Sequence, residues 1–408
     1  MGSLAQLIRI KTAYTRSINL ARDGESLELI RAYLPTSRTL EALTQIAEGL
    51  DDKPHQRALA LIGPYGSGKS AFGLYLGALL SPHREESRQI AASTLHNADV
   101  KLARRFTEFL DNHENGFLRV QVNGIPDSLV RQLMSALAVS VEKNQLTDPA
   151  LVADIRAAAR PGTTMDRLLP LFRRVQSAWA NVGGCGVLVE IDELGKFLEY
   201  ESYHPEHREI HLLQILAEHA QELNRAPLHL VVMLHQAFEH YSHRLGKRLR
   251  DEWHKVQGRF TTLAFLEPAE QSLALVASSF EQEGKLSPEV ESSLTDWSSR
   301  LAGEMALPLG LDEAKSLSLF RRCYPLHPLT LFIFPSPGQV EQIAHGLVLR
   351  GLVPPQVAED ALHIAIAAAH GVDFILTWNF KHIANPTMQY RIAGFLDEIT
   401  GPALYLHT

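Results

Sequence analysis

The octapeptide GPYGSGKS at residues 63 to 70 limits the possible folds of this chain more than any other feature. It has the spacing G-x-x-x-x-G-K-S, an apolar run at 58–62 precedes it, and an apolar stretch with helical character follows it. This order of buried strand, glycine-rich loop and helix is what a phosphate-binding loop requires. The sequence therefore predicts an α/β fold with a nucleotide bound between a strand and a helix.

Each residue type in this loop has a chemical reason. Glycines tolerate unusual backbone angles and leave room, so backbone N–H groups can wrap a β-phosphate. We expect Lys69 to reach the β- and γ-phosphates and the Ser70 hydroxyl to bind Mg²⁺, with ATP as the nucleotide. The predicted ATP-binding residues are Gly63, Pro64, Tyr65, Gly66, Ser67, Gly68, Lys69, Ser70 and Ala71.

A second apolar run, Val187 to Ile191, ends in the acidic pair Asp192-Glu193. Hydrolysis of a nucleotide needs an acidic partner for the loop on another strand. We expect Asp192 to hold the magnesium ion and Glu193 to polarise the attacking water. The alternative for Glu193 is a surface acid at the end of a strand.

Three more apolar runs, at 117–122, 228–234 and 261–266, complete a set of five strand candidates separated by helical segments. This alternation predicts a five-stranded parallel sheet with right-handed crossovers. The fourth strand is followed by His235-Gln236, where a polar side chain would point at the γ-phosphate. Gln236 is the residue predicted to act there in catalysis.

Residues 30 to 330 resemble an AAA+ ATPase of the broad group that includes origin-recognition initiators and the large ATPases of bacterial phage-defence loci. The phrases that resemble the defence-type ATPases most closely are GPYGSGKSAF, EIDELGKFLEY, LHQAFEHY, VQGRF and CYPLHPLT. The resemblance implies a helical lid that opens with EPAEQSLALVASSFEQ, and a lid sensor arginine at Arg321 or Arg322, between which spacing does not choose.

The same resemblance implies that Arg259 reaches the γ-phosphate of a neighbouring subunit, and hence that the chain forms a homo-oligomer. The alternative for Arg259 is an ordinary arginine at a helix end that pairs with a carboxylate.

From about residue 334 the chain resembles the last part of a PIN-domain nuclease. The residues that carry this resemblance are Asp360, with Glu359 beside it, and Thr377 to Asn379. Such nucleases hold Mg²⁺ or Mn²⁺ with three or four carboxylates. The segment PLTLFIFPSP, where the first acidic strand is due, contains no acid, so we interpret the tail as a structural appendage. The predicted domains are an N-terminal segment (1–55), a core with a helical insertion (56–266), a helical lid (267–333) and a partial PIN-like tail (334–408).

The overall composition limits which binding partners the chain is expected to have. A net charge of −7 argues against a basic nucleic-acid coat, but the clusters KLARRF and LFRRVQ are candidates for contact with DNA or RNA. Their alternative is the solvated face of an amphipathic helix. Only two cysteines occur, which fits a reducing cytoplasm, and no apolar window of membrane-spanning length appears. The histidines of YHPEHREIH lack the H-E-x-x-H spacing, so we expect no metal besides magnesium.

Three functions remain. The first is an ATP-hydrolysing motor or switch in phage defence or nucleic-acid handling, with a protein partner from the same defence system. The second is a nucleotide-dependent scaffold without turnover, and the third is an ATP-regulated nuclease that uses the tail. The pair Asp192-Glu193 favours the first function over the second, because a pure switch does not need the glutamate. The missing acidic strand argues against the third.

Overall fold

The computed structural model describes residues 8 to 407 with gaps, and its contacts divide the chain into two compact units. One unit is Arg16–Phe265, and the other combines Met1–Thr15 with Leu266–Thr408. The gaps in the described range are residues 15, 52–56, 147, 161–162, 164, 205–208, 224, 237–240, 242–252, 268, 283–285, 305–312, 325–336, 355–357, 370–373, 377–385 and 401–404.

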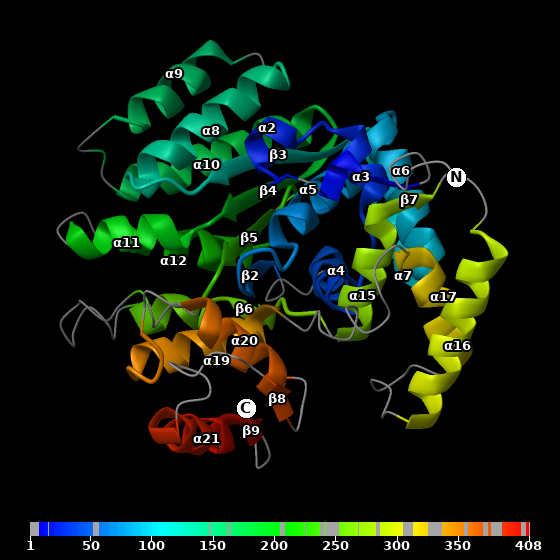
Figure 1. Cartoon of the computed structure of the whole chain (residues 1–408). Coiled ribbons are helices and arrows are strands. Elements are labelled where there is room, and N and C mark those ends of the chain that lie inside the picture. Colours follow the sequence, from blue (N-terminus) through cyan, green and yellow to red (C-terminus); the bar gives the residue numbers. More distant parts are fainter. Residues whose placement is uncertain are drawn as a thin grey trace. The chain divides into compact units, whose positions relative to one another are not determined.

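The unit Arg16–Phe265 is built on a five-stranded parallel sheet with helices on both faces (Figure 1). Its strands are β2 (Ala58–Ile62), β3 (Asn115–Asn123), β4 (Gly184–Asp192), β5 (Leu228–Leu234) and β6 (Thr261–Ala264). Their order is β3-β4-β5-β2-β6, so β5 lies between the strand before the loop and the strand that ends in Asp192. The predicted five-stranded parallel sheet is confirmed.

Helices in this unit begin where the sequence supplies caps. The Ser128 side chain accepts a hydrogen bond from the Arg131 N–H at the start of α8, and Asp148 caps α9 ahead of Pro149. The α-helices bounded within the described residues of this unit include α2 (Leu20–Asp23), α3 (Leu27–Ala32), α4 (Ser37–Leu50), α5 (Lys69–Leu79), α6 (Glu86–Ala98), α7 (Val100–Leu110), α8 (Leu129–Lys143), α9 (Pro149–Ala158), α10 (Leu168–Asn181), α11 (Gly195–Tyr203) and α12 (Ile210–Ala220).

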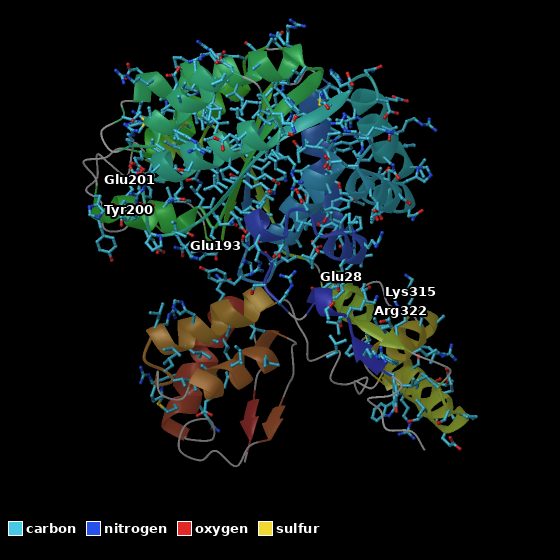
Figure 2. All side chains as sticks on the ribbon, turned by 90° about the horizontal axis from the view of Figure 1, so that it is seen from above. Glu28, Glu193, Tyr200, Glu201, Lys315 and Arg322 are labelled. Carbon is cyan, nitrogen blue, oxygen red and sulfur yellow. The ribbon has the colours of Figure 1, made fainter. Side chains whose placement is uncertain are left out.

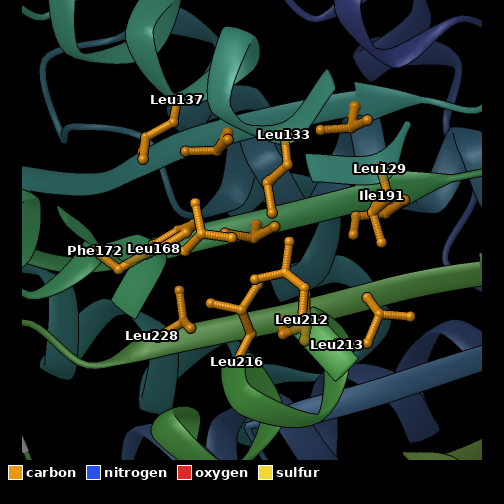
Figure 3. Close-up of a cluster of buried hydrophobic side chains, with 14 of the residues drawn as sticks. Leu129, Leu133, Leu137, Leu168, Phe172, Ile191, Leu212, Leu213, Leu216 and Leu228 are labelled. Atoms are coloured by element: carbon orange, nitrogen blue, oxygen red, sulfur yellow. The ribbon is translucent and has the colours of Figure 1, made fainter. Parts of the chain in front are cut away.

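The main core fills the space between the sheet and helices α8, α10 and α12. Figure 3 shows leucines and a phenylalanine from these helices meeting the strands: Leu133, Leu137, Leu168, Phe172, Leu212 and Leu216. Each is buried, and burial of one such side chain stabilises the fold by about 1.5–3 kcal/mol. This packing anchors β4 and β5, whose carboxyl ends carry the candidate site.

In the other unit, the N-terminal strand β1 (Ile8–Ile10) pairs antiparallel with β7 (Phe280–Gln282). Next to this pair, α15 (Ala269–Ser279), α16 (Pro288–Glu304) and α17 (Glu313–Cys323) share a small core that includes Phe320 and Cys323. The sequence analysis predicted the helices after residue 266 but not the strand pairing.

The tail has its own core among α19 (Pro337–Leu349), α20 (Ala358–Ala369) and α21 (Pro386–Thr400), and β8 (Phe374–Leu376) pairs parallel with β9 (Tyr405–His407). No helix in the described part of the chain has both the length and the apolar character needed to cross a membrane.

A candidate nucleotide-binding site at the carboxyl edge of the sheet

The glycine-rich loop connects β2 to α5 and needs its glycines for two different reasons. Gly66 and Gly68 have φ angles of 78° and 89°, in the left-handed region that side chains rarely adopt. A Cβ atom at Gly63 would lie 2.2 Å from the carbonyl oxygen of Phe265, so the loop backbone passes directly against the chain that follows β6. These constraints hold the loop in a tight curve that ends at the N-terminus of α5, where free N–H groups attract an anion.

The Lys69 side chain lies within the curve of this loop and is only 9% exposed. Its Nζ donates to the carbonyl oxygens of Gly63 (2.5 Å) and Pro64 (2.8 Å) and to Ser67 Oγ (3.1 Å). Burial lowers the pKa of Lys69 to about 8, although the carboxylates of Asp192 and Glu193 act in the opposite direction. Because its hydrogen-bond partners are neutral oxygens, the ammonium charge is available to an anionic ligand.

Asp192 ends β4 beside the first turn of α5. Its carboxylate accepts a hydrogen bond from the Glu193 N–H (2.9 Å), and the Ser70 hydroxyl lies close enough to affect its pKa. Burial raises the pKa of Asp192, and the Ser70 hydroxyl opposes that rise. A hydroxyl and a carboxylate close together at the phosphate loop form an oxygen donor set that fits Mg²⁺.

Glu193 occupies a strained turn directly after β4 and is labelled in Figure 2. Its φ angle is 49°, a left-handed conformation that costs a residue with a side chain on the order of 1 kcal/mol. The end of β3 supports this turn, because the Gly124 N–H donates to the Asp192 carbonyl (2.8 Å) and a Cβ at Gly124 would meet the Glu193 carbonyl oxygen. The Glu193 carboxylate forms an ion pair with Lys196 in the first turn of α11.

An aromatic cluster of Tyr65, His235 and Tyr241 connects the loop to β5 and α11. The Tyr65 ring, 59% exposed, stacks on His235 with centroids 4.8 Å apart, and the Tyr241 hydroxyl lies 2.8 Å from His235 Nδ1. A Cβ at Gly195 would lie 2.3 Å from the same hydroxyl, so Tyr241 packs against the start of α11. Burial lowers the pKa of His235, which favours the neutral imidazole.

This cluster adds His235 to the candidates at the end of β5. His235 stacks on Tyr65 of the loop, Gln236 is half-buried beside it, and the catalytic role of Gln236 stays a prediction. The two residues are adjacent and both polar, so the sequence carried no signal that chose between them. Tyr65 was predicted within the loop, but its aromatic partners were not.

Three arginines with predicted roles differ in their partners. Arg259 pairs with Glu218 of α12 at 3.1 Å, and both side chains are nearly half exposed. This is the ordinary pairing considered as the alternative, and an exposed ion pair of this kind contributes only about 0–1 kcal/mol. Arg321 pairs with Glu291 at 2.6 Å, whereas Arg322 makes a long contact of 3.4 Å with Ser278 Oγ.

The basic clusters of the helical insertion are largely neutralised. Arg105 pairs with Asp51, Arg173 pairs with Glu222, and Arg174 pairs with Asp148 and Asp154. These contacts fit the solvated faces of amphipathic helices better than a nucleic-acid surface.

In the tail, Asp360 lies on α20 next to Glu359, while Thr377 to Asn379 lie outside the described residues. His207 of the histidine-rich segment also lies outside them. Within the described part of the chain, no group of three or more His, Cys, Asp or Glu residues is placed to hold a metal ion.

No protein-family model matches this chain, and no curated protein matches it either. Among solved structures it is similar to the ORC2 protein of Aeropyrum pernix, determined as ADPNP-ADP complexes. The two chains are 11% identical, the match covers 98% of this chain and 87% of the other, and the TM-score is 0.37. That likeness is weak, and the chemistry of the site follows from its own residues. The sheet and the loop together form an α/β fold in which a glycine-rich loop joins β2 to α5.

Proposed function

We propose that this protein binds ATP with Mg²⁺ and hydrolyses it. The observation that carries the proposal is the buried Lys69 ammonium held inside the glycine-rich loop, with the Asp192 carboxylate of β4 close enough to affect its pKa. Two strands that are not neighbours in the sheet thus bring a cation, a hydroxyl and a carboxylate to one glycine-rich loop. This is the donor set that a magnesium-bound triphosphate needs.

Each residue has a defined task in this proposal. The loop N–H groups and the N-terminus of α5 bind the phosphates, and Lys69 exchanges its carbonyl partners for phosphate oxygens. Ser70 and Asp192 would hold Mg²⁺, which neutralises charge on the β- and γ-phosphates when it is bound. Glu193 orients the attacking water and accepts its proton, once the carboxylate has left Lys196.

One observation favours a second candidate, a nucleotide-dependent scaffold without turnover. The Glu193 carboxylate is paired with Lys196, so it is occupied unless that ion pair opens. Both candidates share ATP binding and differ only in whether Glu193 becomes free to act.

Measurement of phosphate release separates the two candidates. For an ATPase we expect magnesium-dependent turnover that EDTA abolishes, and a loss on the order of 10²-fold or more in Glu193→Gln with ATP still bound. Glu199→Gln is the matched control, because this residue lies on the exposed part of α11 and should leave turnover unchanged. Tight ATP binding with no turnover in the parent protein would assign the scaffold function instead.

The predicted place in phage defence or nucleic-acid handling, and the predicted protein partner, rest on the sequence resemblance. Assembly into a homo-oligomer through Arg259 is likewise a prediction. None of these affects the assignment of the loop as the ATP site.

A further inference from the structure

A small pocket in the unit of Met1–Thr15 and Leu266–Thr408 brings two cations together. Its volume is about 270 Å³, and it is lined by Lys11, Ala277, Ser278, Phe280 and Arg322. We call it the Lys11–Arg322 pocket. Figure 2 labels Arg322 on α17, whereas Lys11 follows the N-terminal strand β1.

The backbone holds Lys11 at this place. Ile10 is the partner of Phe280 in the β1–β7 pair, and the Lys11 N–H donates to the Ser279 carbonyl at 2.9 Å. The next turn is closed by a bond from the Tyr14 N–H to the Lys11 carbonyl at 3.0 Å. A residue close to the N-terminus is therefore a fixed part of this pocket.

Ser278 directs the second cation. Its hydroxyl donates to the Ala274 carbonyl at 2.8 Å, so the oxygen is left to accept from Arg322 Nη2 at 3.4 Å. This long contact is weak, but it holds the guanidinium on the side of α17 that faces the pocket.

The charges in the pocket are uncompensated within the described part of the chain. Neither Lys11 nor Arg322 forms an ion pair with a described carboxylate, whereas the adjacent Arg321 pairs with Glu291. Two cations in one pocket repel each other, so an anion that contacts both is favoured.

A second pocket, of about 290 Å³, differs in this respect. There Arg131 pairs with Asp127, and Glu209 accepts hydrogen bonds from Ser128 Oγ and the Val130 N–H at the start of α8. These charged side chains already pair within the protein, so Arg131 is less available to an anion than Lys11 and Arg322 are.

We propose that the Lys11–Arg322 pocket binds a backbone phosphate of single-stranded nucleic acid, with the Phe280 ring available to the adjoining base. A guanidinium fork and an ammonium both match phosphate oxygens. A half-buried aromatic ring beside them provides the sequence-tolerant stacking surface that single strands use. This inference goes beyond the ATPase function and does not require turnover.

The test uses the full chain and a fluorescein-labelled oligothymidylate, with binding followed by anisotropy over a series of salt concentrations. Arg322→Gln and Lys11→Met should each weaken binding about tenfold at low salt. Each should also reduce the slope of log Kd against log salt by about 0.7, because one phosphate contact is lost. Arg321→Gln is the matched control, since its guanidinium is already paired with Glu291, and it should leave the slope unchanged.

The base contact is tested at Phe280. Phe280→Leu should weaken oligothymidylate binding roughly tenfold, and Phe280→Tyr should retain it because the ring is kept. Circular dichroism of each variant checks that the β1–β7 pair and its helices remain folded.

A second titration distinguishes the source of the phosphate. ATP is titrated against the same variants, and this proposal predicts an unchanged affinity, whereas the nucleotide-sensing role that the sequence resemblance implies for Arg321 or Arg322 predicts a lower one. If Arg322→Gln lowers ATP affinity and leaves oligothymidylate binding intact, the pocket serves the nucleotide and the proposal is wrong. An unchanged salt slope in both the Lys11 and Arg322 variants would also overturn it, as would an equal loss in Arg321→Gln.

Discussion

Gly124 lies outside the phosphate loop and the acidic pair. It nevertheless packs directly against the backbone of Glu193 and so helps to position that residue. A Cβ atom added there would lie 2.1 Å from the Glu193 carbonyl oxygen and 2.9 Å from its Cβ. Ordinary van der Waals contact begins at 3.4 Å, so the Glu193 carbonyl has to move by about 1.3 Å to accept the new methyl group. The turn is already left-handed at φ 49°, which leaves few conformations that could absorb the shift.

We therefore expect Gly124→Ala to lower the kcat of ATP hydrolysis on the order of 10²-fold, because displacement of a catalytic group by about 1 Å has an effect of that size. ATP affinity should change little, since the loop from Gly63 to Ser70 is untouched. Overpacking at this site should also lower the free energy of unfolding by about 1–3 kcal/mol.

The assay compares kcat with the Kd for ATP, measured by calorimetry, and checks folding by circular dichroism. Gly394→Ala is the control: nothing lies within 4 Å of the added Cβ, and we expect activity equal to that of the parent. A folded Gly124→Ala protein with normal kcat would refute the view that this close approach positions Glu193.

Three further predictions concern single side chains. Lys69→Ala removes the buried ammonium and should weaken ATP binding tenfold or more by calorimetry; unchanged affinity would contradict the site. Arg259→Ala should bind ATP normally but hydrolyse it about 10³-fold more slowly, with partial recovery on mixing with Glu193→Gln; a concentration-independent rate from a strictly monomeric protein in ATP would exclude action between subunits. Burial raises the pKa of Glu201 from 4.5 to about 8, and the nearby carboxylate of Glu209 adds to the rise. Between these two pH values the folded state keeps a proton that the unfolded state releases, so the free energy of unfolding falls as the pH rises. Urea unfolding should show that Glu201→Gln removes this dependence and is more stable than the parent at pH 8; an unchanged pH dependence would contradict the inference.

Much of the fold could be predicted because its signals are local. Buried parallel strands are continuous apolar runs, and helices start at caps such as Ser128, so the five strands of the sheet could be located from neighbouring residues alone. The loop is local as well, because the angles of Gly66 and Gly68 and the start of α5 are set within a few residues. The position of Asp192 could be predicted too, because it is the last residue of the apolar strand β4.

What only the tertiary structure decided is which distant side chains meet. Periodicity tells which residues are buried, but it does not tell which partner lies opposite, since that depends on how far-apart elements pack. The stacking of Tyr65 on His235, the Arg259–Glu218 ion pair and the support of Glu193 by Gly124 are all of this kind. So is the Lys11–Arg322 pocket, which exists because β1 pairs with β7 and brings Lys11 to a helix encoded far from it in the sequence.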